Sequence, residues 1–369
     1  MPLAGSRLLP EVFQVKQTTD NILSAALNEA RLDSKQLEAL LSVDRDEIPE
    51  VLATACVLNC RFNGEVVTIT PTADVCYTDV CAAPCAYCDS LRPAGRKNFL
   101  LSADDVVRRA AESKGAVEVA LLGAANPKVD LAYATGVLRA VKKSFPSINI
   151  RAFSPFEVSG LAAGAEVGCE KVLAELQSAG LGSLEGVFAD TLGADLRASV
   201  CPSKLFVDHW AEIVNAAGRL GMPVVAAPLV DGKGGAESLA QALDMLRGIQ
   251  EKSHLFVEFA PVFIGPSAVE ERADAFERVL VFCAAARLFF GHRLKFFSFH
   301  WDCRDAAEAA SSLRAGANDI RVDAACAGKA CKAGPECLAA VERIVWDVGR
   351  RPRPLGRPQP AAAPPRALP

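Results

Sequence analysis

Short apolar runs alternate with longer amphipathic segments from about residue 70 to residue 350. The apolar runs have the length of strands, and the segments between them place apolar residues at helical spacing. This alternation is typical of parallel βα units. Eight strands are predicted, over Ala73–Thr78, Val117–Leu122, Ile148–Phe153, Ser183–Phe188, Pro223–Ala227, Leu255–Ala260, Leu294–Phe299 and Asp319–Val322. The predicted helices include Ala103–Ser113, Leu131–Ser144, Lys204–Leu220 and Ala236–Gln250.

Eight βα repeats favour an α/β fold with a TIM-barrel-like (β/α) barrel over residues 71–349. An open doubly wound sheet belongs to the same class and is the alternative, because spacing alone does not separate the two. Residues 1–70 are predicted to form an N-terminal helical cap. Its expected elements are helices over Thr19–Leu32 and Ser34–Leu41 and a leading strand over Glu65–Ile69.

The last segment, residues 350–369, differs in composition from the rest. It contains seven prolines and several arginines. Proline at this density opposes both helices and sheet ladders, so the segment is predicted to be a disordered tail.

Composition is that of a globular protein with a large core. The chain of 369 residues is 51% hydrophobic, and 40 Lys and Arg nearly balance 44 Asp and Glu. A basic surface for nucleic acid is therefore not indicated. The apolar run Val279–Phe290 is interrupted by Arg287 and is shorter than the roughly 20 residues of a membrane span. Met1–Gln14 shows no secretory signal, so we expect a cytoplasmic protein with no membrane or nucleic-acid partner.

Thirteen cysteines are many for such a chain, and they are interpreted as thiols, metal ligands or catalytic groups rather than disulfides. Cys81, Cys85 and Cys88 have the spacing Cys-x3-Cys-x2-Cys, directly after the first predicted barrel strand. Catalytic groups of barrels occupy such loops. Three thiolates suit a 4Fe-4S cluster whose fourth iron keeps an open site. The alternative is a zinc site or unrelated thiols, with Cys76 as a candidate fourth ligand.

The cysteine motif, with an aromatic residue before its last cysteine, resembles that of the radical S-adenosylmethionine (SAM) superfamily. Its lead-in, Tyr77-Thr-Asp-Val-Cys81, resembles the Tyr-Thr-Asn-Val-Cys of one branch. That branch contains the tyrosine-using half of FO (deazaflavin) synthase and the menaquinone futalosine-pathway enzymes. Further matches run in register at Ala152–Glu157, Ala189–Leu192, Arg197–Leu205, Phe256–Pro261, Trp301 and Ala315–Asp319. The chain is therefore identified as a divergent member of this branch.

The resemblance implies a 4Fe-4S cluster on the three cysteines and SAM as cofactors. It also implies that the cluster, reduced by a low-potential electron donor, cleaves SAM to a 5'-deoxyadenosyl radical. The radical would serve C–C bond formation or cyclisation on a small-molecule substrate, a deazaflavin- or futalosine-type precursor. Candidate SAM contacts by motif are Tyr87, Ser154, Glu157, Asp190 and Arg197. Asp190 as a helix N-cap, Arg197 as a surface helix residue and Ser154 as a turn residue are the structural alternatives.

Several positions of the branch are altered where substrate would bind. Its Gln-Gly-Gly-x-x-Pro loop is Leu122–Pro127 here, and its Thr-Ala-Thr-Met-Met-Tyr-Gly-His segment is Val225–Gly232. Its His before Ala-Phe-Ser-Pro is Arg151, and its Gly-Gly-Thr loop is Arg321–Cys326. These changes indicate a different substrate or lost activity. The alternative function is a non-catalytic iron-sulfur or metal-binding protein, and a third is a zinc-dependent lyase or hydrolase on the same barrel.

The altered last loop introduces a second group of cysteines, Cys326, Cys331 and Cys337, with Cys303 as a possible fourth member. One interpretation is an auxiliary iron-sulfur or zinc site. The other is a flexible loop that carries free thiols, because the spacing matches no standard metal motif.

The four histidines form no pair at metal-ligand spacing. His300, at the end of the seventh predicted strand, is the candidate general acid or base. A hydrogen-bonded structural histidine is the alternative.

Overall fold

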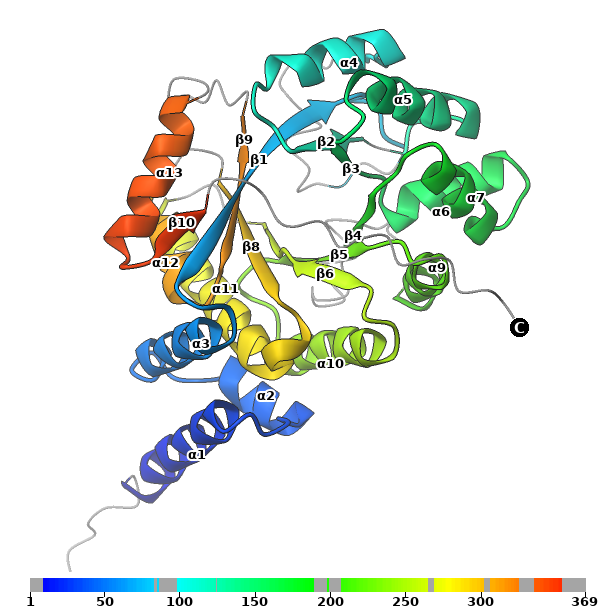
Figure 1. Cartoon of the computed structure of the whole chain (residues 1–369). Coiled ribbons are helices and arrows are strands. Elements are labelled where there is room, and N and C mark those ends of the chain that lie inside the picture. The colour runs from blue at the N-terminus through cyan, green and yellow to red at the C-terminus, as the bar shows by residue number, and fades with distance from the viewer. Residues whose placement is uncertain are drawn as a thin grey trace, which may run out of the picture.

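Eight parallel strands close into a barrel, because the last of them pairs with the first (Figure 1). The computed structural model describes residues 9–82, 85, 98–123, 125–188, 198, 207–264, 269–301, 306–324 and 335–353. The barrel strands are β1 (Val66–Cys76), β2 (Glu118–Leu122), β3 (Asn149–Ala152), β4 (Ser183–Phe188), β5 (Val224–Val230), β6 (Phe256–Phe259), β8 (Phe296–Trp301) and β9 (Asp319–Asp323). The predicted barrel and its eight strands are confirmed, and the open sheet is excluded. A short strand, β7 (Val262–Phe263), pairs with β5 outside the ring.

Helices follow the strands and surround the barrel (Figure 1). They are α4 (Ala103–Glu112), α5 (Leu131–Ser144), α6 (Pro155–Gly164), α7 (Cys169–Ser178), α9 (Val207–Arg219), α10 (Ala236–Ser253), α11 (Val269–Phe290), the 3₁₀ helix η2 (Gly291–Arg293), α12 (Ala306–Arg314) and α13 (Pro335–Asp347). Local signals explain several starts. Ser102 and Asp130 each accept a hydrogen bond from the backbone N–H three residues later, which satisfies a donor at the first turn. The predicted helix Leu131–Ser144 is confirmed at both ends.

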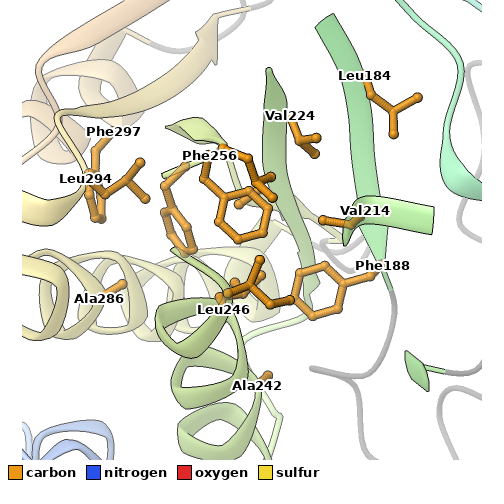
Figure 2. Packing of buried hydrophobic residues seen from close by; sticks show 14 of the residues in the cluster. Leu184, Phe188, Val214, Val224, Ala242, Leu246, Phe256, Ala286, Leu294 and Phe297 are labelled. Atoms are coloured by element: carbon orange, nitrogen blue, oxygen red, sulfur yellow. The ribbon is translucent and has the colours of Figure 1, made fainter. Parts of the chain in front are cut away.

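Alternation along each strand sends apolar side chains outward against the helices. Leu184, Val224 and Phe256 come from three neighbouring strands and belong to one apolar cluster with Val214 of α9 and Leu246 of α10 (Figure 2). Burial of one such Leu, Val or Phe side chain contributes about 1.5–3 kcal/mol to folding. The core therefore lies between barrel and helices, which leaves the inward faces of the strands free to carry polar groups.

The N-terminal helices are α1 (Leu9–Leu27), α2 (Ser34–Leu41) and α3 (Ile48–Asn63), at the end of the barrel where β1 begins (Figure 1). Asp33 and Gln36 form a capping box that starts α2 at the predicted residue. The predicted leading strand Glu65–Ile69 is wrong as a separate element, because residues 66–76 form one strand. Pro71 does not interrupt it: the residue lacks only its N–H, and its carbonyl accepts the N–H of Val117.

The prediction of disorder from residue 350 onward is wrong at its start. Arg351–Arg353 form β10, which pairs in parallel with Val66–Thr68 of β1. A single proline is tolerated at the edge of a sheet, since only one ladder donor is lost. Residues 354–369 lie outside the described residues. In the described part of the chain, no helix has both the length and the apolar content that a membrane crossing requires.

Candidate active site at the carboxyl end of the barrel

The loop that carries Cys81 and Cys85 leaves the carboxyl end of β1. Cys81 is partly exposed, and the Cys85 side chain is buried, with 6% of its surface accessible. Cys88 and Tyr87 lie outside the described residues. Within the described residues, no group of three or more His, Cys, Asp or Glu side chains is arranged to hold a metal ion. Two of the three predicted thiols are thus placed at the mouth of the barrel.

Cys76, the alternative fourth ligand, is the last residue of β1. Its thiol donates to the carbonyl oxygen of Thr78 at 3.4 Å, and burial raises its pKa. A thiol with a raised pKa is a weaker metal ligand at neutral pH. These contacts favour a packing role for Cys76.

A clamp joins the two ends of the cysteine loop. The buried Asp79 carboxylate accepts the backbone N–H of Asn98 at 3.1 Å and that of Phe99 at 2.7 Å. The hydroxyl of Thr78 donates to the Phe99 carbonyl at 2.8 Å and accepts from the Asn126 amide at 2.8 Å. These bonds hold residues 78–79 and 98–99, which flank the loop over residues 80–97, next to each other. The sequence signal for this role was the Asp in place of the branch's Asn in the motif lead-in.

Ser154 and Glu157, predicted as SAM contacts, bind each other at the start of α6. Both the N–H and the hydroxyl of Ser154 donate to Glu157 Oε2 at 2.8 Å, which completes a capping box. Glu157 Oε1 accepts the phenol of Tyr77 at 2.9 Å. Burial, together with the Glu157 carboxylate, raises the Tyr77 pKa well above 10, so the phenol stays protonated. In this structure Ser154 is the N-cap of α6, where the structural alternative was a turn residue, and Glu157 also binds the Tyr77 phenol.

Phe153, just before this capping box, has a backbone φ of 57°. This left-handed conformation is unusual for a bulky residue and costs on the order of 1–3 kcal/mol. The Phe153 ring packs against Tyr77, with ring centroids 6.4 Å apart. Strain of this kind is found where a chain is held for function.

The inward faces of three adjacent strands, β8, β9 and β1, are polar. On β1 the face carries Thr70, Thr72 and Asp74, while the alternate residues pack outward. On β9 and β8 the corresponding residues are Asp319, Arg321, Asp323, Ser298 and His300. Asp319 accepts from Thr70 at 2.9 Å and from Ser298 at 2.8 Å. An ordinary barrel of this type fills its interior with branched apolar residues.

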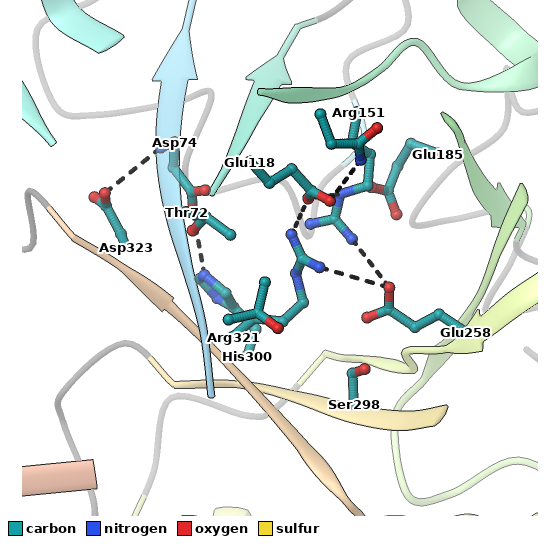
Figure 3. Close-up of polar contacts among 12 residues, drawn as sticks. Thr72, Asp74, Glu118, Arg151, Glu185, Glu258, Ser298, His300, Arg321 and Asp323 are labelled. Carbon is teal, nitrogen blue, oxygen red and sulfur yellow. Dashed lines mark hydrogen bonds and ion pairs between the residues drawn. The ribbon is translucent and has the colours of Figure 1, made fainter. Parts of the chain in front are cut away.

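An ionic layer, defined as Glu118, Arg151, Glu185, Glu258 and Arg321, crosses the lumen (Figure 3). Glu118 binds both guanidinium groups: it pairs with Arg321 and lies 3.3 Å from Arg151 Nε. Glu258 faces the same two guanidinium groups at 3.8 and 3.6 Å. Glu185 lies 3.1 Å from Arg151 Nε. Both arginines are among the departures from the branch, so two changes far apart in sequence meet at one layer.

The layer has three carboxyl groups and two guanidinium groups. Burial lowers the Arg321 pKa, but Glu118 and the other acidic groups outweigh burial and raise it, so Arg321 remains charged. Burial raises the pKa of Glu185, and the neighbouring carboxylates add to this against the opposing effect of Arg151. Glu185 is also the more accessible acid, with 25% of its side chain exposed. Of the three carboxyl groups in the layer, Glu185 is therefore the one best suited to bind a proton or a cationic group.

His300 lies nearer the mouth, where its Nε2 is 3.1 Å from Asp74 Oδ2. Burial alone would raise the Asp74 pKa, but the hydrogen bond and charge of His300 lower it to about 2. The His300 side chain is 51% exposed and that of Asp74 is 14% exposed. The predicted candidate thus has a carboxylate partner on another strand, which the sequence did not identify.

The second cysteine group is described only at Cys337. This residue is fully buried on α13, in an apolar cluster with Val67, Ile320 and Val341. Such surroundings are typical of a cysteine that packs as a small hydrophobic residue. Cys303, Cys326, Cys331, Asp190 and Arg197 lie outside the described residues.

A parallel eight-stranded barrel with a cysteine-rich loop after its first strand defines the chain as a radical SAM enzyme. No protein-family model matches the chain. It is 30% identical over 359 residues to a 5-amino-6-(D-ribitylamino)uracil–L-tyrosine 4-hydroxyphenyl transferase of Methanothermobacter thermautotrophicus, covering 92% of this chain and 96% of the relative. The chain belongs to this family, which contains the tyrosine-using subunit of FO synthase.

Solved structures agree in fold. A methylornithine synthase superposes with a TM-score of 0.66 at 15% identity, covering 90% of this chain and 98% of its own. The FeFe-hydrogenase maturase HydG from Carboxydothermus hydrogenoformans gives a TM-score of 0.69 at 14% identity, covering 92% and 80%. At these identities the likeness concerns the fold alone.

Proposed function

We propose that Cys81, Cys85 and Cys88 hold a 4Fe-4S cluster at the mouth of the barrel and that SAM binds beside it. The observation that carries this proposal is the Asp79 and Thr78 clamp, which closes a loop of three thiols at the carboxyl end of β1. The donor set fits, because three thiolates leave one iron open for SAM. When bound, the cluster and SAM supply a 5'-deoxyadenosyl radical to the lumen.

The substrate is proposed to be a tyrosine-type phenol joined to a second small molecule by C–C bond formation. Support comes from the name of the relative, a transferase that joins the 4-hydroxyphenyl part of L-tyrosine to a ribitylaminouracil. The ionic layer forms the floor beneath this substrate. Because Glu185 is its most accessible acid, we place the substrate's ammonium group there. A cyclisation on a futalosine-type precursor uses the same radical and is the second candidate.

Other residues have supporting roles in this proposal. Tyr87 contacts SAM through its backbone, and Asp190 and Arg197 contact it through their side chains. Glu157 and Ser154 are also placed beside SAM, and Glu157 holds the Tyr77 phenol at the wall. A low-potential electron donor reduces the cluster, and the lumen excludes water from the radical.

The test measures 5'-deoxyadenosine released from SAM by the anaerobic, reconstituted and reduced protein, with iron, sulfide and zinc determined on the same sample. Wild type should release it, and Cys85→Ala should lose both iron and release. Cys169→Ala is the matched control, because that cysteine starts α7 on the outside of the barrel. Full iron without release would instead support the non-catalytic protein, and zinc in place of iron would support the hydrolase or lyase.

A further inference from the structure

His300 and Asp74 form a pair that is not among the proposed cluster ligands and SAM contacts. Asp74 is ionised across the physiological range, since His300 lowers its pKa to about 2. An ionised carboxylate accepts a proton but has none to donate, so Nε2 of His300 carries the hydrogen of the 3.1 Å contact. When the ring is neutral, Nδ1 carries no hydrogen and can accept one. Nε2 is engaged by Asp74 and the side chain is 51% exposed, so Nδ1 is the ring nitrogen left to bind a ligand.

The groups around the pair keep the carboxylate charged. Arg151 on β3 lowers the Asp74 pKa by its charge. Thr72, which lies on β1 with Asp74, lowers it by a hydrogen bond. Asp323 on β9 accepts the backbone N–H of Asp74 at 3.5 Å, and Arg321 on β9 is coupled to Asp74 by charge. The ionised Asp74 carboxylate, whose backbone N–H is held by Asp323, is therefore available to pair with a protonated His300.

The strand next to Asp74 presents apolar side chains to the lumen. In the sheet register Asp74 lies next to Ala120, and Cys76 lies next to Leu122. Alternation places Ala120 and Leu122 on the same inward face as Glu118. Leu122 is 41% exposed, although a leucine inside a barrel would ordinarily be covered. An apolar surface and a base thus lie side by side near the mouth of the lumen.

We propose that His300 is the general base for the phenol of the substrate and that Asp74 positions it. This inference rests on the tyrosine-type substrate of the proposed function. The substrate O–H bond breaks, the proton forms an N–H bond at His300 Nδ1, and Asp74 pairs with the resulting imidazolium. The same proton returns to the phenolate of the product, so no oxidant or reductant is consumed. Loss of the proton makes the ring more electron-rich and eases formation of a radical on the substrate.

The first experiment needs no SAM cleavage. Fluorine NMR of 3-fluorotyrosine bound to the oxidised, cluster-loaded protein reports ionisation of the phenol as pH is raised. The bound phenol should ionise at lower pH in wild type than in His300→Gln, a variant that keeps hydrogen bonding but does not take a proton at neutral pH. Equal ionisation in the two proteins, or no binding to wild type, would overturn the inference.

The second experiment compares product formation from tyrosine and from 3,5-difluorotyrosine, whose phenol is more acidic. His300→Gln should lower the rate with tyrosine about 10²–10⁴-fold, the usual contribution of a general base. The loss should be much smaller with 3,5-difluorotyrosine, because its more acidic phenol ionises more readily without a general base. Asp74→Asn should give a smaller loss with the same rescue, and His209→Gln on the exposed face of α9 should change nothing.

The outcomes separate the inference from the proposed function. Equal losses with the two substrates would mean that His300 has a structural role. Release of 5'-deoxyadenosine without an ionisation difference would uphold the proposed function and reject the base. An ionisation difference without release would support the base and reject the radical chemistry.

Discussion

The phenol of Tyr77 donates a 2.9 Å hydrogen bond to Glu157, and this contact links β1 to the first turn of α6 across β2 and β3. The Tyr77 ring is 2% exposed. Tyr77 directly precedes Thr78 and Asp79, which bind the residues at the far end of the cysteine loop. The wall of the site is therefore built around a protonated phenol that the protein itself supplies.

Gly123 is required by this contact. A Cβ at residue 123 would lie 2.1 Å from the Tyr77 hydroxyl oxygen, and the buried ring has little room to move. Gly123→Ala should lower the free energy of unfolding by about 1–3 kcal/mol, the usual cost of overpacking. Urea unfolding measures it. The control is Gly136→Ala in α5, where a Cβ meets nothing within 4 Å, and the helix should gain up to about 1 kcal/mol. Equal effects of the two variants would contradict the role of Gly123.

Asp79 should determine whether the cysteine loop can be loaded. Asp79→Ala removes two hydrogen bonds to a charged acceptor, each of which contributes about 1.5–3 kcal/mol. We expect faster proteolysis between residues 80 and 97 and a several-fold lower iron content after reconstitution. Asp104→Ala, in the exposed first turn of α4, is the matched carboxylate control. Normal iron loading by Asp79→Ala would show that the clamp is dispensable.

Arg321 should stabilise the barrel by neutralising the buried carboxylates of Glu118 and Glu258. Arg321→Met leaves Glu118 and Glu258 with one fewer cation, and unfolding should become easier by about 3–5 kcal/mol. Adding Glu118→Gln should restore part of the loss, because one uncompensated charge is removed. Arg314→Met on the exposed face of α12 is the control. The measurement is a double-mutant cycle in urea, and strictly additive losses would contradict a shared network.

Glu185 should make the protein less stable as pH rises. Its pKa is raised in the folded state, so folding favours its protonated form, and this contribution is lost above the unfolded value of 4.5. Glu185→Gln should therefore gain stability relative to wild type as pH increases through the raised pKa, with little difference below 4.5. Unfolding free energies between pH 4 and 8 test this, with Glu175→Gln on the surface of α7 as the control. A stability difference that does not change with pH would show that folding does not raise the Glu185 pKa.

The regular parts of the fold follow from local pattern. Strand-length apolar runs and helical spacing predicted the eight barrel strands and the limits of α5, because alternation and capping act over a few residues. Two predictions fail at segments that contain proline. A leading strand was predicted to end at Ile69, and disorder was predicted from residue 350, whereas β1 continues through Pro71 and residues 351–353 pair with β1. Each proline loses one donor and keeps an acceptor or an edge position. Proline content therefore predicts fewer ladder bonds, without deciding whether a strand forms.

The sequence by itself determined the class of protein, because the cysteine spacing and its lead-in are contiguous and their chemistry depends on that spacing. The tertiary structure alone decided the lumen. Glu118, Arg151 and Arg321 each stand in an apolar strand, and nothing local predicts that they meet. Their contact, like that of His300 with Asp74, depends on closure of the barrel and on strand register. Alternation shows which side chains face inward, but only the closed ring brings residues two hundred positions apart within hydrogen-bond distance.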